Sequence, residues 1–132
     1  MNVLFMAHSG LRYLVLLTGL IASLYFVLGA VSRQPLNRVG RNFGMAFAGL
    51  LDLQVVLGFS MVAMGRYYPA LIGHIAMMVS AAVLVHVLLI VNRRKPSPGH
   101  LLPLLGAAVA LILIAGGILA IGRSLLGSTA MG

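Results

Sequence analysis

The sequence predicts an all-α membrane protein, a bundle of four transmembrane helices connected up and down. Of the 132 residues, 61% are hydrophobic and only 8% are charged, whereas soluble proteins carry about 25% charged residues. A helix of about 20 apolar residues is long enough to cross a bilayer, and four apolar stretches have this length: 9–31, 44–64, 70–91 and 101–121. The connections between them are short, as between antiparallel neighbours. We expect one domain, 1–132, without a separate soluble module.

The first stretch, 9–31, is expected to be the first helix of the mature protein, with His8 opening it. No basic residue precedes Arg12, whereas a cleaved signal peptide begins with a positively charged segment. The apolar run is also long enough to stay in the membrane. This stretch therefore predicts a membrane helix and not a leader.

The remaining stretches follow three connections of different character. The segment 32–43 is polar and basic, 65–69 is a tight turn, and 92–100 contains two prolines and a glycine. These residues favour loops and turns, so the helices are expected to end there. Small residues at four-residue spacing, Gly40, Gly44 and Ala48, favour close helix packing. We expect this packing within the bundle.

The charge distribution indicates a membrane topology. The chain has nine Lys and Arg residues and one acidic residue. Six of the basic residues lie in 32–43 and 92–100, against Arg12, Arg66 and Arg123 elsewhere. Cytoplasmic loops carry the excess of basic residues, which predicts a bacterial inner-membrane protein with both termini outside. Since the basic residues lie at the ends of apolar segments, the pattern does not favour nucleic-acid binding.

The absence of cysteine limits the available chemistry. It excludes disulfides, thiol catalysis, cysteine-ligated iron–sulfur clusters and covalent haem attachment. The remaining candidates are the ionisable and amide side chains His8, His74, His86, His100, Asp52 and Gln54. Ionisable residues inside a membrane usually face a cavity, a cofactor or one another.

His8 and His74 are expected at similar depth on two parallel helices, near the outer face. Facing imidazoles from two helices of a bundle are a way of holding a b-type haem. Arg12 follows His8 by four residues, which places it on the same helix face, where it suits a haem propionate. The alternative is that His8 is an interfacial side chain and His74 bonds a carbonyl or a neighbouring helix.

His86 and His100 form the alternative second site. His86 follows His74 by twelve residues, which places it roughly 18 Å deeper and turned by roughly 120°. His100 precedes the last stretch on the same side. A second haem between these two histidines is one interpretation. The other is that His86 bonds within the bundle and His100 caps a loop.

Asp52, the single acidic residue, is expected near the middle of the bilayer, where an unpaired carboxylate is costly. No basic partner is expected beside it. Without a second carboxylate it cannot build an oxygen-rich metal site. Asp52 is then a structural acid bonded to another helix or, with Gln54, a proton- or quinol-binding site.

Three segments resemble one half of the heme A synthase family and also small bacterial four-helix cytochrome b-like membrane proteins: HSGLRYL, LQVVLGFSMV and GHIAMMVSAA, beginning at residues 8, 53 and 73. Each half of the synthase is a four-helix bundle with a histidine opening one helix, LQ-x-x-LG on the next, and a histidine opening the one after. The resemblance implies that His8 and His74 are haem ligands and gives no role to His86 and His100.

The sequence also departs from that family. The synthase has a carboxylate three residues before its first histidine and an arginine directly after it, where this chain has Phe5 and Ser9. The chain is also half the size of the full enzyme. The resemblance therefore implies a haem-binding bundle rather than a complete haem-oxidising enzyme.

The sequence thus predicts a small membrane cytochrome b-like protein or subunit with one haem b per chain, near the outer face, for electron transfer. The expected partners are the lipid bilayer and a larger membrane electron-transfer complex or a homo-oligomer. One alternative is a haem-free accessory subunit of a respiratory or photosynthetic complex. Another is a haem- or quinone-modifying enzyme with Asp52 as proton donor.

Overall fold

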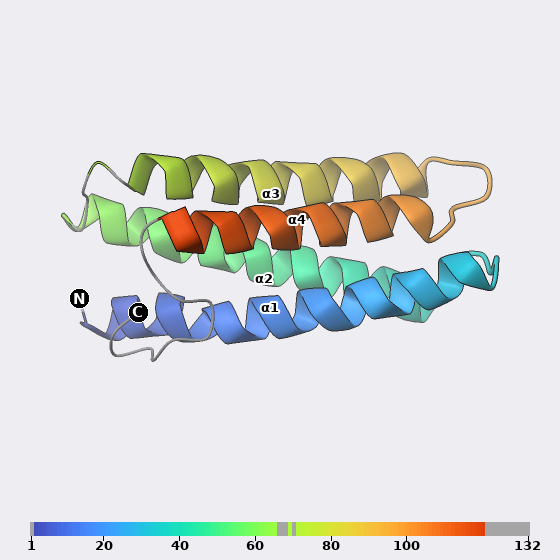
Figure 1. Cartoon of the computed structure of the whole chain (residues 1–132), viewed down its shortest axis with the longest axis horizontal. Coiled ribbons are helices and arrows are strands. Elements are labelled where there is room, and N and C mark those ends of the chain that lie inside the picture. Colours follow the sequence, from blue (N-terminus) through green and yellow to red (C-terminus); the bar gives the residue numbers. More distant parts are fainter. Residues whose placement is uncertain (1, 66–68, 70, 121–132) are drawn as a thin grey trace.

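The computed structural model describes residues 2–65, 69 and 71–120, and these form four α-helices in one bundle (Figure 1). The helices are α1 (Asn2–Val31), α2 (Arg38–Ala63), α3 (Leu71–Arg93) and α4 (Leu101–Ala120). Successive helices run in opposite directions, so the predicted four-helix up-and-down bundle is confirmed. All four helices are long and apolar enough to cross a membrane.

The first two helices begin earlier than predicted. α1 starts at Asn2 rather than at residue 9, and α2 starts at Arg38 rather than at residue 44. Hydropathy detects the part of a helix that suits hydrocarbon, whereas the helix itself continues until its backbone donors are capped. Asn37 caps α2, because its side chain accepts a hydrogen bond from Gly40 N at 2.8 Å. His8 consequently lies in the second turn of α1 and does not open the helix, which corrects the prediction.

The two basic loops meet at one end of the bundle. α1 ends where Arg33 adopts the left-handed conformation, with φ of 54°, as residues just after a helix commonly do. Leu36 N in the first loop donates to Pro98 O in the second at 2.9 Å. Buried Asn92 holds the second loop, because its Nδ2 donates to Gly99 O at 2.9 Å. The loops therefore fix the helix ends together.

The helices are arranged around the bundle in the order α1, α2, α3, α4, and α3 packs most extensively against α4. Gly44 is buried, and a Cβ atom added to it would lie 3.1 Å from Leu89 Cδ2. Gly40 and Ala48 are buried too, so this line of small residues serves packing within the bundle. The core consists mainly of apolar side chains, and Phe26, Phe47, Leu51 and Val15 are among the most completely buried of them.

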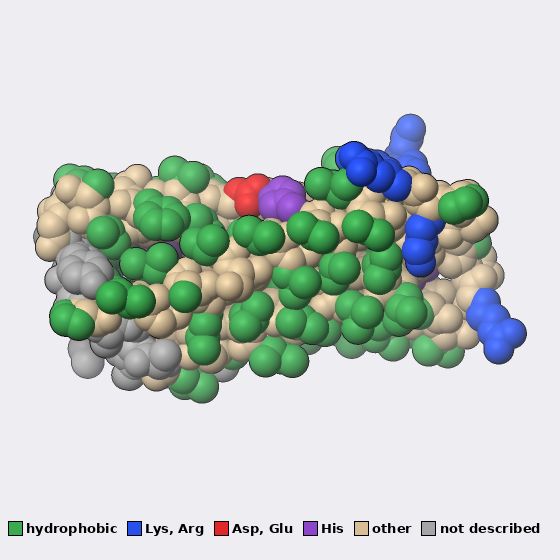
Figure 2. Space-filling view, turned by 90° about the horizontal axis from the view of Figure 1, so that it is seen from above, with side chains coloured by type: hydrophobic (Ala, Val, Ile, Leu, Met, Phe, Trp, Pro, Cys, Tyr) green, Lys and Arg blue, Asp and Glu red, His purple; other side chains and the backbone are tan. Residues whose placement is uncertain are grey.

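The surface is apolar along the bundle and basic at one end (Figure 2). The predicted clustering of Lys and Arg in the two loops is therefore seen in three dimensions. Arg66 and Arg123 lie outside the described residues, as does the end of the fourth predicted stretch at residue 121. Which end faces the cytoplasm stays a prediction.

Candidate functional site

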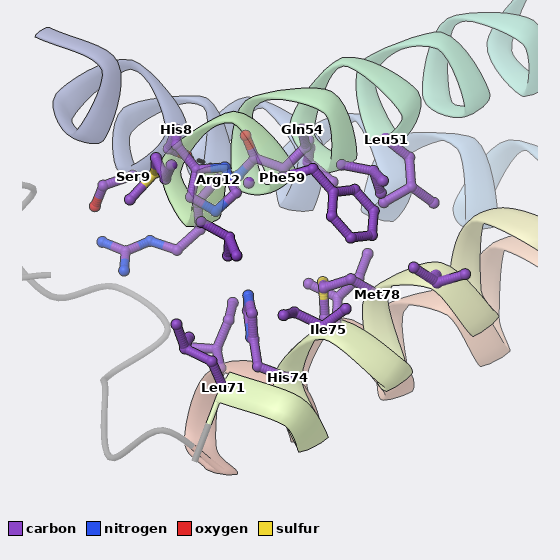
Figure 3. A pocket seen from close by; sticks show the side chains of 18 of the residues that line it. His8, Ser9, Arg12, Leu51, Gln54, Phe59, Leu71, His74, Ile75 and Met78 are labelled. Atoms are coloured by element: carbon purple, nitrogen blue, oxygen red, sulfur yellow. Dashed lines mark hydrogen bonds between the residues drawn. The ribbon is translucent and has the colours of Figure 1, made fainter. Parts of the chain in front are cut away.

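A cavity of about 340 Å³ lies between the four helices (Figure 3). Its lining residues come from the start of α1 and α3 and from the later parts of α2 and α4, which is the end of the bundle opposite to the basic loops. Its volume falls at the lower end of the about 300–1,000 Å³ that is usual for small-molecule and cofactor sites. The polar side chains in its wall are His8, Ser9, Arg12, Gln54 and His74, and most of its other lining residues are apolar. We call it the His8–His74 cavity.

His74 is held in a defined orientation at the start of α3. Its Nδ1 lies 2.9 Å from the carbonyl oxygen of Gly117 on α4. A carbonyl oxygen only accepts, so Nδ1 carries a hydrogen, and in the neutral imidazole Nε2 is then the nitrogen with the lone pair. A Cβ atom at position 117 would lie 3.4 Å from Nδ1 and 2.6 Å from the Met78 methyl carbon. Glycine therefore lets the α4 backbone approach the imidazole and fix its tautomer.

His8 belongs to the opposite wall. Its ring packs on Gly58 of α2, where an added Cβ atom would lie 3.3 Å from His8 Cε1. Gln54 Nε2 donates to the carbonyl oxygen of His8 at 2.7 Å, so α2 fixes the turn of α1 that carries the imidazole. In Figure 3, His74 points into the cavity toward the wall that holds His8 and Arg12. The two histidines that the sequence pairs thus line one cavity.

Arg12 lies in the same wall as His8, as predicted from their four-residue spacing. It is 5% exposed, and its Nη2 donates to Tyr13 Oη at 2.9 Å. Its guanidinium carbon lies 4.7 Å from the centre of the Tyr13 ring. Buried guanidinium groups pair well with carboxylates, so this wall suits a ligand with acidic substituents.

Ser9 adds a polar atom that the sequence interpretation missed, and Gln54, which that interpretation joined to Asp52, adds others to the His8–His74 cavity. Gln54 Oε1 and Ser9 Oγ are buried without a hydrogen-bond partner among the described residues, although buried polar atoms are normally paired. The LQ-x-x-LG segment was the available signal, because it places Gln54 and Gly58 four residues apart on one face of α2.

Asp52 lies outside the cavity and has a basic partner, contrary to the expectation. Its Oδ1 and Oδ2 lie 2.9 and 2.7 Å from His86 Nε2, and both side chains are 47% exposed. The pair forms because α2 and α3 are antiparallel neighbours and both residues lie well inside their helices. Gln54 lines the cavity instead, so the structure does not join Asp52 and Gln54 in one site.

His86 and His100 do not share a cavity. His100 is 4% exposed, its Nδ1 donates to Gln34 O at 3.0 Å, and its ring packs against Gly29 of α1. His86 bonds to Asp52 on the surface. The structure therefore does not bring these two histidines together as a second haem would require. Within the described ranges there is also no group of three or more His, Asp or Glu residues that could hold a metal ion.

The substitution Asp52→Asn is expected to leave any cofactor spectrum unchanged, because Asp52 points away from the cavity that Leu51 and Val55 line on the same helix. An amide also keeps a hydrogen-bonding partner for His86. The check is the absorption spectrum of the purified variant beside the parent. Loss of the cofactor from a folded variant would show that Asp52 acts on the cavity.

Comparisons with protein-family models, with curated proteins and with solved structures find no match for this chain. The likeness to the heme A synthase family thus stays a prediction from the three sequence segments.

Proposed function

We propose that the chain is a small membrane cytochrome b-like protein that binds one haem b between His8 and His74 for electron transfer. The observation that carries the proposal is the His74 imidazole, which is hydrogen-bonded through Nδ1 to Gly117 O and faces the wall that holds His8. Haem-ligating and metal-ligating histidines commonly donate their second ring nitrogen in this way. Haem supplies one-electron redox chemistry when it is bound.

The residues of the His8–His74 cavity would each make a separate contribution to haem binding. His74 offers Nε2, and the hydrogen bond to Gly117 O holds its ring plane. His8 offers a second imidazole from α1. Arg12 balances the charge of acidic substituents. The apolar side chains around them exclude water, which tunes the redox potential of a bound metal.

The absorption spectrum of the purified protein, expressed with haem supplied, tests this proposal. We expect a low-spin spectrum that changes reversibly on reduction, since two imidazoles complete the coordination of the iron. A folded protein that stays colourless would contradict the proposal and favour the haem-free accessory subunit instead.

We also propose that the basic end of the bundle faces the cytoplasm of a bacterial inner membrane, so that the haem lies near the outer face and the N-terminus is outside. The support is the clustering of six basic residues in the two joined loops. A C-terminal fusion to a reporter that is active only in the cytoplasm should stay silent. Strong activity of that fusion would show that the C-terminus lies in the cytoplasm and that the orientation is the opposite of the proposed one.

A further inference from the structure

The Asp52–His86 pair lies on the outer surface of α2 and α3, inside an apolar face (Figure 2). Each side chain is 47% exposed. The neighbouring exposed side chains are apolar, among them Val56 on α2 and Val83 on α3. Ionisable side chains within membrane segments pair with one another, as these two do, and almost always face a bundle interior or a water-filled cavity, as these two do not. This pair therefore occupies a position that a bare lipid contact does not explain.

We propose that the α2–α3 face is the contact between two copies of this chain. Closed twofold dimers are the commonest oligomers among soluble proteins, and in any twofold dimer the same patch faces itself. Two copies inserted the same way into a membrane are related by an axis parallel to the helices. That rotation places α2 of one copy opposite α3 of the other without changing the depth of any residue.

The twofold rotation makes the pair self-complementary. Asp52 and His86 lie at one depth, because they are hydrogen-bonded, and they lie side by side on neighbouring helices. The rotation exchanges left and right across the interface, so each Asp52 meets the second copy's His86. A carboxylate has two oxygens with several acceptor sites, so the two pairs close into a network of four groups that lipid no longer contacts.

The backbone next to the pair also permits close approach. Gly49 lies three residues before Asp52, on the same side of α2. A Cβ atom added to it would meet nothing within 4 Å, so the helix surface is open there. Glycine on a lipid-facing surface lets another helix approach closely. The buried Gly44, in contrast, already packs against Leu89 inside the bundle.

Cross-linking tests the contact directly, because the chain has no native cysteine. Val56 lies four residues after Asp52, and Val83 lies three before His86 on the antiparallel helix, so the two positions lie at nearly the same depth. The rotation places them opposite one another on different copies. Two differently tagged variants, one carrying only Val56→Cys and the other only Val83→Cys, are mixed in liposomes. We expect a short bifunctional thiol reagent to link them across copies.

The control is an equally exposed pair on the opposite face, Leu17→Cys on α1 with Ile112→Cys on α4. These side chains are 54% and 69% exposed, against 60% and 55% for Val56 and Val83. We expect at least a severalfold excess of linked dimer for the α2–α3 pair. Equal linking of both pairs, or linking of neither, would overturn the proposal. The purified chain would give this result if the α2–α3 face bound a lipid-soluble molecule or another protein instead of a second copy.

A second pair of variants separates the contact between copies from the bond within one copy. Asp52→His alone and His86→Asp alone each place like groups opposite one another in a dimer. A mixture of the two variants again places imidazole opposite carboxylate at both positions, although neither chain keeps its internal pair. Combined with the cysteines, each variant alone should lose most of its cross-linking, and the mixture should regain it. Failure of the mixture to exceed the single variants would contradict the proposed symmetry.

Discussion

Replacement of His74 or His8 by alanine is expected to remove the haem or leave its iron five-coordinate. Both imidazoles line the cavity, and no other histidine among the described residues does so. Loss of an outer-shell partner of a metal ligand costs about 10–100-fold in affinity, so loss of the ligand itself should cost more. The measurement is the reduced absorption spectrum of each purified variant at equal protein concentration.

The chain supplies two matched controls for this experiment. His86→Ala should keep the parent spectrum, because His86 lies on the outer surface. His100→Ala should keep it as well, although loss of the buried ring and of its bond to Gln34 O lowers stability. If the parent carried two haems per chain and both control variants lost half of this haem, a second haem site at His86 and His100 would be indicated.

Gly58→Leu is expected to give the second large effect. A Cβ atom at this position already lies 3.3 Å from the His8 ring, so the longer leucine side chain must extend into the cavity or displace His8. Overpacking typically costs about 1–3 kcal/mol, and about 1.4 kcal/mol is a tenfold change in affinity. Haem affinity should therefore fall by about 5- to 150-fold, measured by titration of the haem-free protein.

Gly73→Leu is the matched control, since it also places leucine at a helical glycine. Gly73 lies beside His74 in sequence, is exposed, and has nothing within 4 Å of an added Cβ atom. Its haem affinity should stay close to that of the parent. Equal losses in the two variants would indicate a general effect of leucine on the helices and not a filled cavity.

The sequence was sufficient to predict which helices form and which histidines lie at the same depth. Length, hydropathy and the direction of each segment determine depth, so His8 and His74 were paired before any contact was known. The sequence-based prediction placed the start of α1 too late. Residues 3–7 are apolar like the stretch that follows, but the ionisable His8 interrupts the run, and nothing in the sequence marks a helix cap at Asn2. The prediction therefore placed His8 at the opening of the helix.

Lateral neighbours were harder to predict than depth. The bond between Asp52 and His86 depends on how α2 and α3 are rotated about their axes, and this rotation results from packing across the whole core. The same holds for the acceptor of His74, which is a backbone carbonyl on α4 that becomes accessible because residue 117 is glycine. A single sequence shows the glycine but not the ring that it faces.

The haem content of the purified parent protein tests the central claim most directly. The protein is expressed with haem supplied, and the haem extracted into alkaline pyridine is compared with the amount of folded chain. We predict haem b at one per chain, because one cavity brings two histidines together. A folded, helical protein without haem, after expression and after direct titration with haem, would contradict the claim.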